Sequence, residues 1–135
     1  MKRMNVIAVY SPDMTKLLMC KRTKNPYKDL YNFVGGKIDV DNDDLNEAYR
    51  ELKEETNISK EDIELVHLMR STYYRAGLEL EVFYGVLKHD VELIEEVNKL
   101  EWIEIEGENF FDMKKYAGEG NIGHILEWIK YDMNK

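Results

Sequence analysis

The stretch from Gly35 to Ile58 decides the fold, and it reads GGKIDVDNDDLNEAYRELKEETNI. A glycine pair leads into a loop rich in Asp and Asn, after which apolar residues recur at helical spacing. We expect this helix to begin near Asp43 or Asp44, since Asp caps helices well, and to end near Thr56. Asn57 follows, and Asn is the usual second choice after Gly for the left-handed residue that closes a helix.

One face of the predicted helix carries four carboxylates. At about 100° per residue, Glu54 and Glu55 fall on either side of Glu51. Glu47 lies one turn before them and also fits a capping box with Asp44. Like charges at this spacing destabilise a helix, and nothing within the helix is expected to offset them. A bound Mg²⁺ or Mn²⁺ would do so, because hard cations take oxygen ligands, whereas the simpler alternative is a solvated acidic face.

The residues around the carboxylates favour a metal site over a solvated acidic face. The pair Gly35-Gly36 lets the backbone approach a ligand closely. Lys37 follows at once, and Arg50 stands beside Glu51, where it can orient a carboxylate or neutralise phosphate charge. The stretch therefore combines groups suited to a metal ion with groups suited to phosphate.

The bulk composition sets limits on the class of protein. A chain of 135 residues suits one domain, 1–135, and a formal net charge of −8 argues against a general grip on a nucleic-acid polymer. No apolar run approaches the ~20 residues of a membrane span, so no membrane partner is expected. Cys20 is the single cysteine, and the N-terminus resembles no signal peptide, so we expect a cytoplasmic protein. The composition is compatible with either a monomer or a homodimer.

The central stretch resembles the signature of the Nudix hydrolases. That signature runs Gly, five residues, Glu, seven residues, then Arg-Glu-aliphatic-x-Glu-Glu-x-Gly-aliphatic. Two positions depart from it, because Asn42 replaces the first Glu and Asn57 replaces the second Gly. The positions that match in register are Gly36, Arg50, Glu51, Leu52, Glu54, Glu55 and Ile58. The resemblance implies an α/β fold, the family's α/β/α sandwich with a mixed sheet, and points to the MutT-like branch.

The resemblance also implies roles for individual residues. The metal ligands would be Glu51, Glu54, Glu55 and the carbonyl of Gly35, binding Mg²⁺ or Mn²⁺. Glu54 would act in catalysis and Arg50 would hold the catalytic glutamates in place. Lys37 would lie near the substrate phosphates. Asn42 removes one charge, which we expect to weaken metal binding without abolishing the site.

Two residues outside the signature resemble family site residues. Many members take a further glutamate from a loop before a strand with an exposed Trp, and here Glu95-Glu96 precede Trp102. We expect Glu96 to be an extra metal ligand or general base, with Glu95 as the close alternative. Arg22 resembles a phosphate-contacting arginine. A solvated acidic loop and an ordinary surface arginine are the respective alternatives.

Candidate base-binding residues are scattered along the chain. The run Tyr31–Phe33 resembles the Trp-Asn-Phe of relatives that act on nucleoside triphosphates, so Asn32 is expected to contact a base while Phe33 packs in the core. Tyr74 lies about where the dinucleoside-polyphosphate branch carries a tyrosine. Asn121 precedes the last helix and would contact a base or simply cap that helix.

The remaining pattern predicts one sheet and a second helix. β-favouring runs and alternation predict strands, with Ser11-Pro12-Asp13 as the turn of a first hairpin. The expected strands are 5–10, 16–22, 63–74, 78–87 and 100–105, and the last helix is expected to run from Asn121 to about Met133.

The function expected from the resemblance is metal-dependent hydrolysis of a pyrophosphate bond. The nucleotide substrate is expected to be a nucleoside triphosphate, including damaged ones, cleaved to a monophosphate and pyrophosphate. Hydrolysis of dinucleoside polyphosphates or nucleotide sugars is the second enzymatic interpretation. A non-catalytic nucleotide-binding domain is the third, and only Asn42 supports it.

Overall fold

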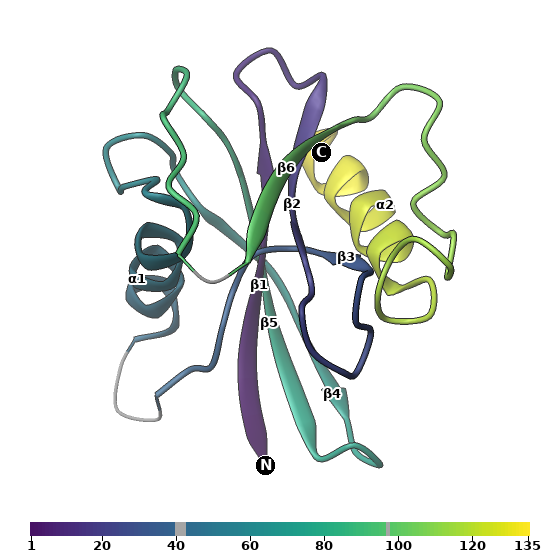
Figure 1. Ribbon diagram of the computed structural model, residues 1–135. Helices are drawn as coiled ribbons and strands as arrows, with labels where there is room; N and C mark the ends of the chain where they lie inside the picture. Colours follow the sequence, from purple (N-terminus) through teal and green to yellow (C-terminus); the bar gives the residue numbers. More distant parts are fainter. Residues whose placement is uncertain (40–42, 97) are drawn as a thin grey trace.

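Helices α1 (Asp44–Thr56) and α2 (Asn121–Met133) cover opposite faces of one β-sheet (Figure 1). The computed structural model describes residues 1–39, 43–96 and 98–135. In chain order, the strands are β1 (Lys2–Tyr10), β2 (Lys16–Lys21), β3 (Tyr31–Asn32), β4 (Val66–Tyr73), β5 (Leu78–Val86) and β6 (Lys99–Glu104). The layering confirms the predicted α/β/α arrangement.

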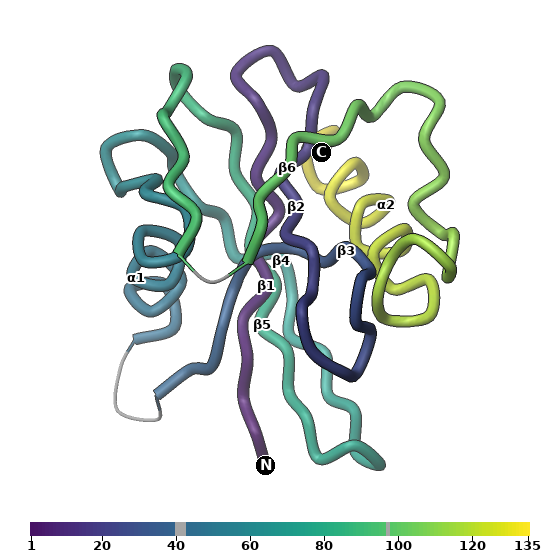
Figure 2. Tube along the Cα trace, viewed as in Figure 1, coloured from purple at the N-terminus to yellow at the C-terminus, as the bar shows by residue number. Residues whose placement is uncertain are grey.

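The sheet is mixed, as predicted. Its order is β3-β2-β1-β5-β4, and β6 pairs with β2. Strands β1 and β5 run parallel, from Lys2 opposite Leu78 to Tyr10 opposite Val86, and lie side by side at the centre (Figure 2). The other strand pairs are antiparallel. The pairing of Tyr10 with Leu17 confirms the first hairpin.

The glycine pair lies alongside β1, within the plane of the sheet. After β3, the chain pairs with β1 through the amide of Ile7, which donates to the carbonyl of Val34 at 2.8 Å. The amide of Asn5 then donates to the carbonyl of Gly36 at 2.9 Å. The loop that leads into α1 is therefore fixed by main-chain hydrogen bonds to a central strand.

Each helix packs over its own hydrophobic core, because strand side chains alternate between the two faces. Phe33 is buried under α2, as predicted. The buried residues under α2 are Ala8, Tyr10, Leu17, Met19, Phe33, Val82, Tyr84, Ile103, Phe110, Tyr116, Ile122, Ile125 and Ile129. Those under α1 are Ile7, Val9, Leu18, Cys20, Val34, Ala48, Leu52, Ile58, Ile63, Leu65, Phe83 and Leu87.

The start of α1 differs from the predicted capping box. Asp43 is the N-cap, and its carboxylate accepts a hydrogen bond from the amide of Asn46. Asp44 is already helical, and the capping box of Asp44 with Glu47 is wrong. The Glu47 carboxylate is instead 2% exposed and accepts two hydrogen bonds from Arg50.

Two of the three remaining helix ends are set by residues with positive φ. Asn57 closes α1 at φ 75°, and its amide donates to the carbonyl of Lys53, which confirms the predicted helix stop. Gly120 is the N-cap of α2 at φ 88° and makes no side-chain capping bond. The prediction that Asn121 caps α2 is therefore wrong, since Asn121 is the first helical residue.

The third predicted strand begins later than expected. Strand β4 starts at Val66, while Ile63 forms an isolated bridge with Leu87 beyond the end of β5. Among the described residues, no helix is long and apolar enough to cross a membrane.

Candidate metal centre

Two carboxylates of α1 pack directly on the backbone of the glycine pair. A Cβ atom placed on Gly36 would lie 2.4 Å from Oε2 of Glu51, so a side chain there would displace the Glu51 carboxylate. The amide of Gly35 donates to Oε2 of Glu55 at 3.4 Å. On the other side of the pair, a Cβ atom on Gly35 would lie 2.1 Å from the carbonyl oxygen of Asn5. Both glycines are needed because backbone and carboxylates approach so closely.

Asn5 holds the glycine pair in place, and the sequence analysis missed it. Its Oδ1 accepts a hydrogen bond from the amide of Gly36 at 2.9 Å. Its side chain is buried, and its Nδ2 atom has no hydrogen-bond partner within the described part of the chain. The available signal was a single amide residue inside the otherwise apolar run from Asn5 to Tyr10. Buried polar groups are normally paired, so such a residue in a central strand points to a specific contact.

Arg50 gathers three of the four helix carboxylates. It donates to both carboxylate oxygens of Glu47 at 2.9 and 2.7 Å, to Glu51 at 2.9 Å, and to both oxygens of Glu54 at 2.9 and 3.0 Å. The expectation that nothing within the helix offsets these charges is therefore wrong. Glu55 is the exception, because it contacts no cationic side chain in the described segments.

The ionised forms of Glu51 and Glu55 are disfavoured at the glycine pair. Burial, then repulsion from Glu51 and Glu54, raises the pKa of Glu55 to about 7, although the Gly35 amide opposes the shift. Burial also raises the pKa of Glu51, against the effect of Arg50. An added cation would stabilise the ionised form of both carboxylates.

The oxygen donors at this point fit a hard divalent cation. Glu51 and Glu55 offer carboxylates, and the Gly35 carbonyl accepts no hydrogen bond from the described residues. Glu54 faces Arg50 instead and its side chain is 59% exposed. In the described ranges, no three Asp, Glu, His or Cys side chains already surround one point where a metal would sit. Mg²⁺ keeps several water ligands, so two carboxylates and a carbonyl are a compatible set.

The loop between β5 and β6 runs beside the C-terminal end of α1 (Figure 1). The amide of Ile94 donates to the carbonyl of Thr56 at 3.1 Å. Glu95 accepts a hydrogen bond from the amide of Leu100 at 2.7 Å, so its carboxylate closes the loop. Glu96 is exposed and makes no hydrogen bond or ion pair with a described residue. Of the two glutamates that the sequence left as alternatives, Glu95 is thus engaged in the loop and Glu96 is not.

Arg22 and Asn32 approach the same face of the sheet as α1. Asn32 lies opposite Cys20 in the β2–β3 register, and Cys20 belongs to the core under α1. Burial, then the charge of Glu55, raises the pKa of the Cys20 thiol to about 12, while Arg22 opposes this shift. The charges of Glu55 and Arg22 therefore both act on the Cys20 thiol. The Arg22 guanidinium also donates to the carbonyl of Pro26 at 2.7 Å.

The other predicted site residues lie in different places. Lys37 is exposed next to the glycine pair, opposite Met4. Tyr74 is 81% exposed at the tip of the β4–β5 hairpin, and Asn121 begins α2 on the opposite face of the sheet. The structure therefore does not bring Tyr74 or Asn121 to the carboxylates. Asn42 lies outside the described residues.

Solved structures of similar fold include proteins with different substrates. A MutT structure, from work on Aliivibrio salmonicida and Vibrio cholerae, has a TM-score of 0.71 at 17% identity, covering 96% of this chain and 98% of that one. An Ap4A hydrolase of C. elegans has a TM-score of 0.72 at 19% identity, covering 96% and 98%. A bifunctional NMN adenylyltransferase/ADP ribose pyrophosphatase of Francisella tularensis, complexed with AMP and a manganese ion, has a TM-score of 0.72 at 19% identity, covering 97% and 41%.

These likenesses establish the fold. No curated protein sequence matches the chain. The sequence itself matches the NUDIX domain family over residues 1–128, which includes the glycine pair, α1 and the loop that carries Glu96. The resemblance found in the signature is thereby confirmed, and the chain belongs to the NUDIX domain family, the Nudix hydrolases that act on pyrophosphate bonds.

Proposed function

We propose that this protein hydrolyses a nucleoside triphosphate to a monophosphate and pyrophosphate at a divalent metal centre beside the glycine pair. One observation carries the proposal. Glu51 and Glu55, both with raised pKa, pack on the backbone of Gly35-Gly36, where no described residue donates to the Gly35 carbonyl. A divalent cation at this point would stabilise the charged form of both carboxylates.

Glu51, Glu55 and the carbonyl of Gly35 would hold the ion, and Glu54 would join them by leaving Arg50. Glu54 is free to do so because it is exposed and its bond to Arg50 is a surface ion pair. Mg²⁺ or Mn²⁺ at this position would neutralise phosphate oxygens and lower the pKa of a water ligand.

The protein groups then have distinct tasks. Glu54 or Glu96 would accept the proton of the attacking water, whose oxygen bonds to phosphorus as the anhydride oxygen leaves. Arg50 is proposed to keep Glu51 and Glu54 oriented through the contacts described above. Glu96 is preferred over Glu95 as the loop carboxylate, because Glu95 already binds the Leu100 amide.

Substrate contacts are proposed for the residues on the α1 side of the sheet. Arg22 and Lys37 would bind phosphate oxygens, and Asn32 would contact the base. Tyr74 and Asn121 lie away from the carboxylates, so we do not propose them as substrate-binding residues. Tyr74 was the residue that favoured dinucleoside polyphosphates. A non-catalytic role is disfavoured because all three helix glutamates of the signature are present.

The proposed setting is a cytoplasmic one with a small-molecule nucleotide as partner. The formal net charge of −8 disfavours a nucleic-acid polymer, since polymer binding usually needs a basic face.

The test is a panel of nucleoside triphosphates, a dinucleoside polyphosphate and a nucleotide sugar, each with Mg²⁺ or Mn²⁺. Phosphorus NMR identifies the products directly. Release of pyrophosphate from a triphosphate supports the proposal. Cleavage restricted to the dinucleotide or the sugar would overturn the substrate class, and no cleavage with either metal would overturn the hydrolytic role.

A further inference from the structure

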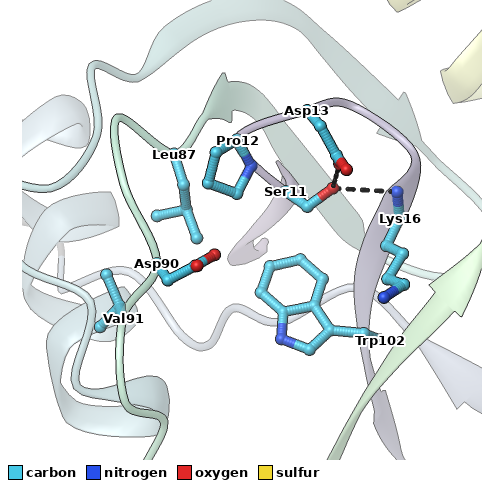
Figure 3. Close-up of a pocket in the computed structure, with 8 residues that line it drawn as sticks. All are labelled: Ser11, Pro12, Asp13, Lys16, Leu87, Asp90, Val91 and Trp102. Carbon is cyan, nitrogen blue, oxygen red and sulfur yellow. Dashed lines mark hydrogen bonds between the residues drawn. The ribbon is translucent and has the colours of Figure 1, made fainter.

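A cavity lies on the α1 side of the sheet, away from the glycine pair. It has a volume of about 330 Å³, close to the lower end for small-ligand sites and suited to a single ring system. Its walls come from the turn after β1, the start of β2, the segment after β5, and β6 (Figure 3). The lining residues are Ser11, Pro12, Asp13, Lys16, Leu87, Asp90, Val91 and Trp102.

The cavity occupies a place where α/β folds commonly bind ligands. Strands β1 and β5 are the parallel pair, and they end at Tyr10 and Val86. Ser11 and Leu87, the residues that directly follow these two strand ends, both line the cavity. Ligands of open α/β sheets commonly bind outside the carboxyl ends of parallel strands.

One wall of the cavity is fixed by a hydrogen-bonded turn. Oδ1 of Asp13 accepts bonds from the Ser11 hydroxyl at 2.8 Å and from the amide and hydroxyl of Thr15 at 3.0 and 2.8 Å. Mainly because of these bonds with Thr15, the pKa of Asp13 falls to about 2. The Ser11 hydroxyl oxygen also accepts from the amide of Lys16 at 3.0 Å. Asp13 and Ser11 are therefore occupied in shaping the turn.

The opposite wall is tethered in the same way. The amide of Leu87 donates to the carbonyl of Tyr10 at 3.0 Å, and the amide of Lys88 donates to the carbonyl of Asp62 at 2.9 Å. His89 contacts the Asp62 carboxylate at 2.7 Å. The segment that leads to Asp90 is thus held at three points.

Three groups that face the cavity remain available to a ligand. The Asp90 carboxylate makes no hydrogen bond or ion pair with a described residue. Figure 3 shows it and the ring of Trp102 facing the same space, with Pro12 and Leu87 across from the ring. The ammonium group of Lys16 lies on the other side and is paired only loosely, 3.9 Å from Glu104. The cavity therefore offers an aromatic face, one acceptor and one donor.

We propose that this cavity binds a purine base with paired N–H donors, of which guanine is the fitting one. The base would lie on the Trp102 ring, since aromatic rings stack on bases. Its N1–H and amino group would donate to the two oxygens of Asp90, as a carboxylate accepts from two adjacent donors. Its O6 and N7 would accept from Lys16, a contact that Lys makes with guanine elsewhere. The cavity is a binding site separate from the metal centre.

Fluorescence of the full chain tests the proposal. Trp102 and Trp128 are the two tryptophans, so Trp128→Phe leaves Trp102 as the only reporter. Guanosine is added in EDTA, because it has no phosphate and cannot be drawn to the metal centre. We expect a saturable change in Trp102 emission, and clearly weaker binding of inosine, which lacks the amino group.

Asp90→Asn in the same background should weaken guanosine binding about tenfold, because the amide cannot accept from both donors. Glu127→Gln is the matched control, since it removes one exposed carboxylate from α2 and should leave binding unchanged. Thermal unfolding checks that both variants fold. The proposal is overturned by an absence of saturable change, by equal affinity of the Asp90→Asn variant, or by binding of inosine as tight as that of guanosine. The result is independent of hydrolysis, so it does not bear on the proposed reaction.

Discussion

Two clusters of carboxylates lie on the α1 side of the sheet, and they differ in how their charge is balanced. The strand cluster is defined by Arg3, Asp44, Arg70, Glu79 and Glu81. Glu81 is fully buried, yet it lies 2.7 Å from Arg70 and 3.4 Å from Arg3, and it also contacts His67 at 2.9 Å. Arg3 further pairs with Asp44 at 2.9 Å and with Glu79 at 3.0 Å.

The helix cluster is defined by Glu47, Arg50, Glu51, Glu54 and Glu55. Three of its four carboxylates share the guanidinium of Arg50, and Glu55 contacts no described cationic side chain. The three carboxylates of the strand cluster share two guanidinium groups and a histidine. Buried charges are stable when they are paired and costly when they are not. The strand cluster is therefore expected to stabilise the fold, while the helix cluster is expected to need a cation and to serve the reaction.

The largest expected effect is on turnover. Glu51→Gln should lower it by about 10²- to 10³-fold, because a metal site supplies several kcal/mol of charge stabilisation to the transition state. The measurement is the rate of nucleotide hydrolysis with Mg²⁺ and with Mn²⁺, together with Mn²⁺ binding by electron paramagnetic resonance. Glu79→Gln, a half-buried member of the strand cluster, is the control and should retain turnover. Full activity of Glu51→Gln with both metals would contradict the distinction between the clusters.

A substitution in the strand cluster should lower the stability of the protein. Glu81→Gln removes the buried charge that Arg3 and Arg70 share, so the free energy of unfolding should fall by about 2–4 kcal/mol. Urea unfolding measures this change. Glu104→Gln disrupts only the exposed contact with Lys16 and should change stability by less than about 0.5 kcal/mol. If the Glu81 variant instead lost Mn²⁺ affinity at unchanged stability, the strand cluster would serve the metal centre and not the fold.

Glu55→Gln should stabilise the metal-free protein, with a definite pH dependence. Burial and its acidic neighbours raise the pKa of Glu55 from 4.5 to about 7, so the folded state binds the proton more tightly than the unfolded state. Its contribution to stability is complete below about pH 4.5 and is lost as the pH rises through 7. Gln mimics the neutral carboxyl group, so the variant should be more stable than the parent by about 1–3 kcal/mol at pH 8 in EDTA.

The control is the same comparison near pH 4.5, where the two proteins should have nearly equal stability. Saturating Mg²⁺ at pH 8 should reverse the order, because binding to the folded parent stabilises it. A stability difference that does not vary with pH would show that the charge of Glu55 is not the cause.

The helix cluster could be predicted from the sequence because its members are local. Helical periodicity alone placed Glu51, Glu54 and Glu55 on one face, and Asn57 closed the helix as expected. The contacts of Arg50 with three carboxylates at once could not be predicted in this way, because they depend on side-chain conformation. The same reasoning also misplaced the N-cap by one residue, because Asp43 and Asp44 are equally suitable in composition.

The strand cluster could not be predicted, because it depends on register between strands that are distant in sequence. Arg3 meets Glu79 only because β1 and β5 run parallel, and no pattern within either strand fixes that pairing. The complete burial of Glu81 also depends on the other strands, because its partners are Arg3 of β1 and His67 and Arg70 of β4. The position of Tyr74 was equally out of reach, since the direction of the β4–β5 hairpin decides it.

Asn5 links the two clusters and gives the smallest expected effect. It lies opposite Glu81 in the β1–β5 register. Its Oδ1 accepts a hydrogen bond from the amide of Gly36, the residue against which Glu51 packs. Asn5→Leu removes that acceptor but also removes the buried Nδ2 that has no described partner, so stability should change little. Because the glycine pair loses its anchor, we expect Mn²⁺ binding by electron paramagnetic resonance to weaken about three- to tenfold, which corresponds to about one lost hydrogen bond. Unchanged Mn²⁺ affinity with strongly reduced stability would instead place Asn5 with the strand cluster, as a residue that supports the sheet and not the metal centre.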